Sequence, residues 1–547
     1  MQSIRNRSRI KVEDDVEAAD QKEVDVQLQG TKSLSTAKLF FIIFMIRLFN
    51  ALTMKTFFQA DEYYQALEPA HAYVFGYGYV TWEWKERLRS SIHPWIYIMG
   101  YKLVSLFSDD VEMIILVPKV IGAILATIGE VGLYKLSQVY TKDEYISRVT
   151  LLLSLFNPFN WYIITRSFSN SFETILTILG LLFWPWDYKI NYSRFIISFI
   201  FSITSILTRP TNGLIWGYLG LNYLINVKAN IFQIIKLGMV FLITSIIIIS
   251  ISLGLDYQFY GELTFPVYNF IEFNVIKNLS IFYGVAPWHF YLFQTIPILL
   301  MTYLPFLIHS ELWLKHYKDI LSQVSIFVTI GFSLIEHKEF RFIYPLQPMF
   351  LILCSYSVKQ FMQIKTIATT IRKGIIYLII IINILITIFF SQIHERGAID
   401  VIDYLKNDSN NVKSMGFLTP CHSTPWQSHI HNTLLSNNSW FLTCEPPLHL
   451  TDVSATVENI HAYRDESDQF YDNRLQFLTD NFPPFNKIDY NKRYHEWPSH
   501  LIIFEPEEQF MNQFLESSSY YQCRRFFNSY FHWDSRRNGD FIVYCKT

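Results

Sequence analysis

The sequence is poor in charged residues. Only 17% of its 547 residues are Asp, Glu, Lys or Arg, whereas a soluble globular chain typically carries about 25%. The formal net charge is −2, and no segment has the strongly basic balance that nucleic-acid binding requires. The chain is too long for a disulfide miniprotein and, with 51% hydrophobic residues, too apolar for a disordered protein. A membrane protein is the class that remains.

Several motifs are also missing. The sequence has no P-loop and no Gly-rich dinucleotide-binding turn. No spacing of His, Cys and Asp resembles a metal site, and we expect no metal and no cofactor.

The charges divide the chain into three segments. Residues 1–37 hold 6 Lys or Arg and 7 Asp or Glu without an apolar period, which predicts a disordered cytoplasmic tail. Residues 38–391 hold 26 Lys or Arg and 20 Asp or Glu, a net charge of +6. They contain the long apolar runs of a transmembrane domain, whose first lumenal loop is 55–111. Residues 392–547 hold 13 Lys or Arg and 20 Asp or Glu, a net charge of −7, and this segment predicts a soluble lumenal C-terminal domain.

The apolar runs predict about eleven membrane-spanning helices, since a bilayer core needs about 20 apolar residues per helix. These runs lie at 38–54, 112–134, 146–164, 170–186, 194–208, 212–226, 233–254, 288–308, 320–335, 340–358 and 374–391. Lys and Arg in alternate loops place the N-terminus in the cytoplasm and the C-terminal domain in the lumen. That assignment requires the apolar run at 92–107 to lie in or on the membrane without crossing it. The predicted fold class is therefore a polytopic α-helical membrane protein.

The C-terminal segment mixes strand-like runs with polar helical ones. The runs KSMGFLTP, HLIIFE and DFIVYC predict strands, so we expect a small α/β domain. Four of the chain's five cysteines lie there, at Cys421, Cys444, Cys523 and Cys545. In an oxidising lumen they permit two disulfides with three possible connectivities, and four unpaired thiols are the alternative.

The first lumenal loop carries the densest group of polar residues. Asp61 and Glu62 lie between aromatic residues just after the first apolar run, and Glu68 and His71 follow. A helix cap is the common role of an isolated Asp-Glu pair. The polar continuation TWEWKERLRSSIHP at 81–94 favours a functional role instead, because ionisable groups at a membrane are costly and are usually functional.

Cations gather on the same expected side of the membrane. In EHKEFRF at 336–342, five of seven residues are ionisable. The candidate cations are His337, Lys338, Arg341, Arg166 in TRSFSNSFE, Arg209 in LTRPTN, and His289 in GVAPWHFY. Together with a carboxylate base they fit an anionic lipid headgroup. Taken singly, each could instead anchor a helix at the membrane surface.

The motifs QADEYYQ, TRSFSNSFE, LTRPTN and HKEFRFIYPLQP resemble those of the dolichyl-phosphate-mannose-dependent mannosyltransferases of glycosylphosphatidylinositol (GPI) and N-glycan assembly. These enzymes form glycosyltransferase family 22 and have the GT-C fold. The resemblance runs from about residue 38 to the C-terminus. Related enzymes often have His-Pro before the Asp-Glu pair. The sequence has Gln59-Ala60 there, which is similar to the branch that adds the third mannose of the GPI core.

The resemblance implies an inverting transfer of mannose from dolichyl-phosphate-mannose to the 2-hydroxyl of the second mannose of a GPI lipid, at the lumenal face of the endoplasmic reticulum membrane. Asp61 is then the expected base, and Glu62 orients the acceptor or supports Asp61. His337, Lys338 and Arg341 are expected to hold the phosphate, with Arg209 as a further candidate. Trp82 and Trp84, with Tyr63 and Tyr64, could stack on sugars or seat the polyprenyl chain; an interfacial aromatic belt is the alternative.

Two other functions fit parts of the sequence. A sister mannosyltransferase could act on dolichol-linked oligosaccharide or add a later GPI mannose. A lipid or sugar transporter is more remote, because transporters usually show repeated halves with binding groups near the membrane midplane. The sequence has no such repeat, and its ionisable groups gather at one face.

Overall fold

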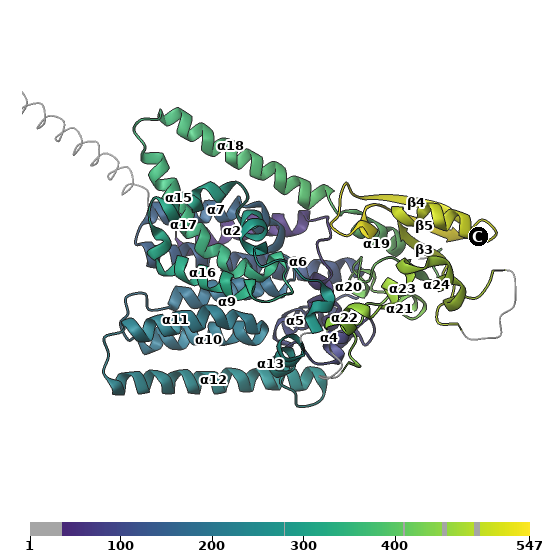
Figure 1. Cartoon of the computed structure of the whole chain (residues 1–547), viewed down its shortest axis with the longest axis horizontal. Helices are drawn as coiled ribbons and strands as arrows, with labels where there is room; N and C mark the ends of the chain where they lie inside the picture. The colour runs from purple at the N-terminus through teal and green to yellow at the C-terminus, as the bar shows by residue number, and fades with distance from the viewer. Residues whose placement is uncertain (1–34, 278, 409–410, 451–456, 486–492) are drawn as a thin grey trace, which may run out of the picture.

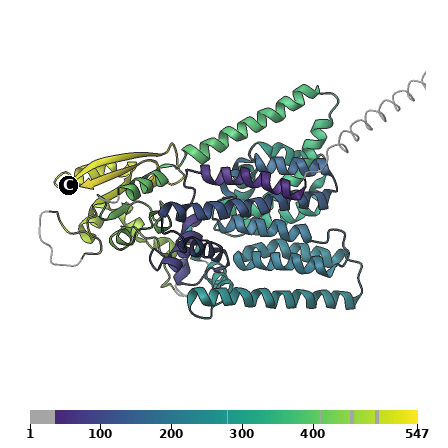
Figure 2. The same ribbon diagram turned by 180° about the vertical axis from the view of Figure 1, so that it is seen from behind.

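The computed structural model describes residues 35–277, 279–408, 411–450, 457–485 and 493–547. Long helices lie side by side in a bundle, and a smaller domain with a sheet lies at one end of it (Figures 1 and 2). The predicted tail lies outside the described residues except for its last three, 35–37.

Five helical segments of the described part are long and apolar enough to cross a bilayer. They are Thr36–Thr53, Val111–Thr141, Ile231–Tyr260, Tyr291–Leu312 and Thr369–Asn407. The first three are α2, α6 and α12, and the last begins with α18 (Thr369–Ile388). Helix α12 exposes apolar residues such as Phe232 and Ile243, as a lipid-facing helix does. The chain is a multi-pass membrane protein.

Other expected spans are shorter or interrupted. Helices α9 (Ser169–Phe183), α10 (Tyr192–Thr208) and α16 (Ile320–Ser333) are apolar but short. The run at 146–164 forms α7 (Glu144–Leu155) and α8 (Pro158–Ile163), which separate at Asn157-Pro158 because proline has no N–H to continue a helix. The total of eleven spans therefore stays a prediction.

The remaining helices of the bundle are α11 (Gly213–Asn226), α13 (Pro266–Ile271), α14 (Ile296–Leu300), α15 (Leu304–Leu312) and α17 (Gln347–Gln363).

The first loop folds into short helices at the end of the bundle. They are the π-helix η1 (Tyr63–Leu67), α3 (Glu68–Phe75), α4 (Trp82–Lys85) and α5 (Ile92–Ser105). Helix α5 has 14 residues, which at 1.5 Å each give about 21 Å, less than the roughly 30 Å of a hydrocarbon core. It packs against α3 and α6. The expectation that this run does not cross the membrane stays a prediction, because α16, an expected span, has the same length.

The C-terminal part contains a five-stranded mixed sheet in the order β2-β1-β3-β5-β4. Its strands are β1 (Met415–Leu418), β2 (Trp440–Phe441), β3 (His500–Phe504), β4 (Tyr520–Ser529) and β5 (Gly539–Lys546). Strand β1 runs parallel to β2 and β3, and β5 runs antiparallel to β3 and β4. The three strand-like runs of the sequence are β1, β3 and β5. The helices of this C-terminal part are α19 (Gly397–Asn407), α20 (Gln427–Ile430), α21 (Thr433–Asn438), α22 (Val457–Ala462), α23 (Glu466–Asp472), α24 (Arg474–Asn481) and α25 (Glu508–Phe514).

The four cysteines of this part form two disulfides. Cys421 pairs with Cys444, and Cys523 with Cys545, which selects one of the three connectivities that the sequence left open. The fifth cysteine, Cys354, is free and buried in α17.

One hydrophobic cluster joins the first loop to the C-terminal domain. Tyr63 and Tyr97 from the loop pack in the same cluster as Phe417, Trp426 and Ile502 from the domain. All five are less than 5% exposed. The loop that carries Asp61 and Glu62 is therefore held between the helix bundle and the sheet domain.

Candidate active site

Asp61 and Glu62 lie directly before η1, and Glu62 is its N-cap residue. Turns of π-helix occur frequently at functional sites. Neighbouring residues on a helix point about 100° apart, and these two side chains have different surroundings. The Glu62 side chain is 10% exposed and the Asp61 side chain 26% exposed. The pair therefore presents one enclosed and one accessible carboxylate.

Glu62 is held by Arg166, which lies in the turn between α8 and α9. The guanidinium Nη1 donates to Glu62 Oε2 at 2.7 Å, Nη2 donates to Thr56 Oγ1 at 3.0 Å, and Nε donates to the Tyr162 carbonyl at 2.8 Å. Burial raises the pKa of Glu62, and Arg166 acts in the opposite direction. With all three of its nitrogens engaged, Arg166 positions Glu62.

Asp61 lies against a different cation. Arg341 Nη1 is 2.5 Å from Asp61 Oδ2, and Gln65 donates to the same oxygen. Arg341 belongs to η8 (Phe340–Leu346), and its Nη2 and Nε lie 2.6 and 2.8 Å from Glu339 Oε2. Burial acts to raise the pKa of Glu339, but Arg341 and His337 lower it well below its usual range. An ionised Glu339 thus fixes the guanidinium beside Asp61.

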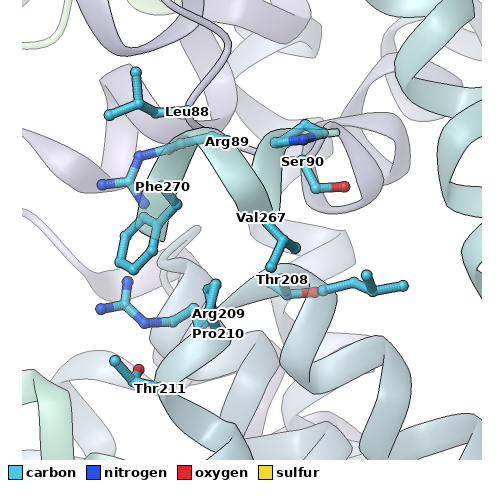
Figure 3. Close-up of a pocket in the computed structure, with 11 residues that line it drawn as sticks. Leu88, Arg89, Ser90, Thr208, Arg209, Pro210, Thr211, Val267 and Phe270 are labelled. Atoms are coloured by element: carbon cyan, nitrogen blue, oxygen red, sulfur yellow. The ribbon is translucent and has the colours of Figure 1, made fainter. Parts of the chain in front are cut away.

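Two further arginines line a cavity beside this centre. Arg209, at the C-terminal end of α10, is 3.2 Å from Glu173 and donates to Ser169 Oγ at 3.1 Å. Arg89, between α4 and α5, is bound by both carboxylate oxygens of Glu83 at 2.7 and 3.0 Å. Their guanidinium groups lie toward the same side of the cavity (Figure 3). Its apolar walls include Leu207, Pro266, Val267 and Phe270.

Arg89 was not among the residues expected at the site. It lies in the polar segment TWEWKERLRSS, so the density of charge in that segment was the available signal. The Coulomb interactions of Arg89 with Asp61 and Arg341 place it in the same electrostatic environment. The structure brings Asp61, Arg341, Arg209 and Arg89 together.

The other two cations of the HKEFRF motif support the loop. His337 Nδ1 lies 2.9 Å from the Gly284 carbonyl and Nε2 lies 3.4 Å from Glu339. Burial acts to lower the pKa of His337, but its hydrogen bond to Glu339 raises it. Lys338 donates to the carbonyls of Ala286 (2.8 Å) and Ile335. These contacts fold the motif so that Arg341 faces Asp61.

The remaining expected residues have other neighbours. Trp84 is 2% exposed and its indole N–H donates to the Tyr64 carbonyl in η1 at 3.0 Å. Trp82 is 6% exposed and its ring contacts Phe273. Their burial leaves little of either ring accessible to a sugar. The His289 ring contacts its neighbours Trp288 and Phe293.

The segment PCHSTPWQSHIH of the C-terminal domain, residues 420–431, contacts η1 and the residue that follows it. Glu68 is fully buried, and one of its carboxylate oxygens accepts hydrogen bonds from Trp426 N (3.0 Å), Ser428 N (3.1 Å) and Ser428 Oγ (2.7 Å). The Tyr64 hydroxyl donates to the Thr424 carbonyl at 3.2 Å. Burial raises the pKa of Glu68 to about 7. These contacts connect the C-terminal domain to the turn that carries Asp61 and Glu62.

One group of metal-ligand residue types was found in the described part of the chain: Cys421, His422 and Cys444. Its two cysteines are joined in a disulfide. Metal ligation requires thiolates, so this group does not fit a metal site in the disulfide form.

The fold resembles that of a solved structure. A solved structure of ArnT from Cupriavidus metallidurans bound to undecaprenyl phosphate superimposes with a TM-score of 0.57. The match covers 92% of this chain and 97% of that one, at 11% sequence identity. The likeness concerns the fold alone, which in this chain is a helix bundle with a smaller domain at one end and the carboxylates at their junction.

Sequence comparison gives the family. The model of the Alg9-like mannosyltransferase family matches residues 38–431. "GPI mannosyltransferase 3" of Debaryomyces hansenii is 58% identical, with 94% of this chain and 93% of the relative covered. The protein of that name from Candida albicans is 51% identical, covering 94% and 100%. The mouse "GPI alpha-1,2-mannosyltransferase 3" is 33% identical, covering 91% and 86%.

The chain belongs to the Alg9-like mannosyltransferase family. The resemblance described from the motifs is confirmed, as is the expected mannosyltransferase activity. The transporter alternative is rejected.

Proposed function

We propose that the chain adds the third mannose to a GPI lipid precursor from dolichyl-phosphate-mannose, forming an α1,2 bond with inversion at the transferred sugar. The names and near-complete coverage of the fungal relatives support a GPI acceptor. The name of the mouse relative supports the α1,2 linkage. The contact between Asp61 and Arg341 carries the chemical part of the proposal.

Asp61 is the general base. It accepts the proton of the acceptor's 2-hydroxyl while that oxygen forms a bond to the anomeric carbon of the donor mannose. The bond from this carbon to the phosphate oxygen breaks, and dolichyl phosphate leaves with the electron pair. Asp61 suits this role because its side chain is 26% exposed, whereas Glu62 is enclosed and engaged by Arg166.

The arginines on the Asp61 side stabilise the leaving phosphate. Arg341 contacts the base directly, and Arg209 and Arg89 line the adjacent cavity. Guanidinium groups bind phosphate strongly, and fixed cations stabilise charge that develops in a transition state. The apolar walls of the cavity suit the polyprenyl chain. Lys338 and His337 hold the loop in this structure, so we assign them to positioning Arg341.

These cations supply the positive charge without a metal ion, so we propose that the reaction needs none. A chelator added to the assay described below should leave the transfer rate unchanged. A rate that falls with chelator and recovers when a divalent cation is added would contradict this part.

We place the active site in the lumen of the endoplasmic reticulum. Two disulfides in the C-terminal domain support an oxidising compartment. The donor and acceptor are both lipids anchored in that membrane. The domain contacts the loop of Asp61 and Glu62, so the two lie on the same side of the bilayer.

A sister reaction on dolichol-linked oligosaccharide is the alternative, since the family model covers an Alg9-like group. Purified protein, supplied with dolichyl-phosphate-mannose and a two-mannose GPI lipid, should give a three-mannose product that an α1,2-mannosidase shortens again. Transfer to dolichol-linked oligosaccharide with none to the GPI lipid would contradict the proposed acceptor.

A further inference from the structure

A second cavity lies on the Glu62 side of η1. Part of its lining is apolar and comes from the C-terminal end of α2 and from α6, with Ala51, Met54 and Ile115. Other parts of its lining come from η1, the Arg166 turn and the C-terminal helices α19 and α20. This cavity shares no lining residue with the arginine-lined one.

Lys119, on α6, is the cation of this cavity that is free to bind. It lines the cavity together with Glu62, Arg166 and His429. The nitrogens of Arg166 already donate to Glu62, Thr56 and Tyr162. Lys119, by contrast, has no hydrogen bond or ion pair within the part of the chain that the structure describes. The charges that act on Lys119 are those of Asp403, Glu62, Glu112 and Arg166, and its own charge acts on His429.

The wall beside Lys119 suits a sugar. His429 belongs to α20 and is 8% exposed. Burial lowers the pKa of His429 to about 3, and the charge of Lys119 acts in the same direction. A neutral imidazole has one N–H donor and one acceptor nitrogen, which suits a hydroxyl-rich ligand. The cavity thus combines an apolar wall, one available cation and a neutral polar group.

We propose that this cavity binds the phosphodiester of an anionic glycerolipid, with Lys119 as the cation that contacts it. The inference rests on the proposed function, because a lipid-anchored acceptor must approach the carboxylates, and this cavity is where we expect it to approach. Glu62 lines this cavity, and Arg89 and Arg209 line the other, so each of two lipid-linked substrates can have a cavity of its own. The phosphodiester is that of the acceptor itself or that of a neighbouring phospholipid.

The test compares Lys119→Gln with wild type on two acceptors. One is a two-mannose GPI lipid, and the other carries the same two mannoses on an uncharged alkyl group. If the acceptor's phosphodiester occupies the cavity, the variant raises KM for the GPI lipid about ten-fold, the usual effect of losing a charge-assisted contact. KM for the uncharged acceptor and for the donor should not change. Lys119→Arg should restore the low KM.

Nanodiscs distinguish the second source. If a bulk phospholipid occupies the site, adding phosphatidylinositol to phosphatidylcholine discs changes wild-type transfer to the uncharged acceptor, and Lys119→Gln removes that response. Lys142→Gln, at the exposed C-terminal end of α6, is the matched control and should behave as wild type. Equal kinetics of Lys119→Gln and wild type on both acceptors and in both discs would overturn the proposal.

Binding without turnover separates this inference from the proposed function. Native mass spectrometry of the detergent-purified wild type should show retained phosphatidylinositol, and Lys119→Gln should retain less. If wild type transfers no mannose but shows this difference, the proposed function fails and the cavity stands. If transfer succeeds and Lys119→Gln equals wild type both in lipid retention and in the kinetics on both acceptors and in both discs, the cavity proposal fails alone. Unchanged elution on gel filtration confirms that the variant is folded.

Discussion

The two sides of η1 differ although their carboxylates are adjacent in sequence. Glu62 is enclosed, and Arg166 binds it while engaging Thr56 and Tyr162 as well. Asp61 is more exposed, and its partner Arg341 is shared with Glu339. The Glu62 side thus resembles a structural ion pair, whereas the Asp61 side keeps its base accessible. Adjacent acidic residues therefore have different roles because different segments pack against each of them.

The largest loss of activity should come from substitution of Asp61, the more accessible carboxylate. Asp61→Asn keeps the shape of the side chain but removes the base, so the transfer rate should fall by about a thousand-fold. The folded protein should remain, since Asn can still accept hydrogen bonds from Gln65 and Arg341. The assay is kcat with saturating donor and acceptor. A variant that retains more than a tenth of the activity would contradict the role of Asp61.

The enclosed side should respond mainly in stability. Glu62→Gln leaves the buried Arg166 without a countercharge, and breaking a buried ion pair typically costs about 3 kcal/mol or more. The melting temperature should fall clearly, while kcat of the protein that remains folded should fall less than in Asp61→Asn. The matched measurement is thermal unfolding of both variants in the same detergent. The comparison fails if Asp61→Asn is the less stable variant and Glu62→Gln the less active one.

The smallest effect should be on the pH dependence of stability, through Glu68, which follows η1 and binds the C-terminal domain. Burial raises the pKa of Glu68 from 4.5 to about 7, so its contribution to stability is present at pH below 4.5 and is lost as the pH rises through 7. Glu68→Gln removes this titration while keeping an acceptor oxygen for Trp426 and Ser428. Its melting temperature should therefore fall less than that of wild type between pH 5 and pH 8. Parallel pH profiles of the two proteins would show that Glu68 does not titrate there.

The types of secondary structure and the candidate carboxylates Asp61 and Glu62 could be predicted from the sequence. The apolar runs predicted most helices, and three apolar segments predicted β1, β3 and β5. The interruption at Asn157-Pro158 and the shortness of α9 and α10 show why spans cannot be counted from hydropathy alone.

Partners distant in sequence could not be predicted. The pairing of Arg166 with Glu62 and of Arg341 with Asp61 depends on how the bundle brings separate loops together. The contact of Glu68 with Trp426 and Ser428 depends on the docking of a domain whose sequence shows only strand-like and polar runs. Lys338 was expected at the phosphate, but backbone carbonyls engage its ammonium in the structure, which residue type alone could not reveal.

The central claim is that the chain adds the third mannose of a GPI lipid. It is tested most directly by depleting the protein in cells and analysing the mannose-labelled lipids that accumulate. We expect accumulation of a GPI lipid with two mannoses, which the restored wild-type chain removes and Asp61→Asn does not. Accumulation of a truncated dolichol-linked oligosaccharide, with GPI lipids unchanged, would contradict it.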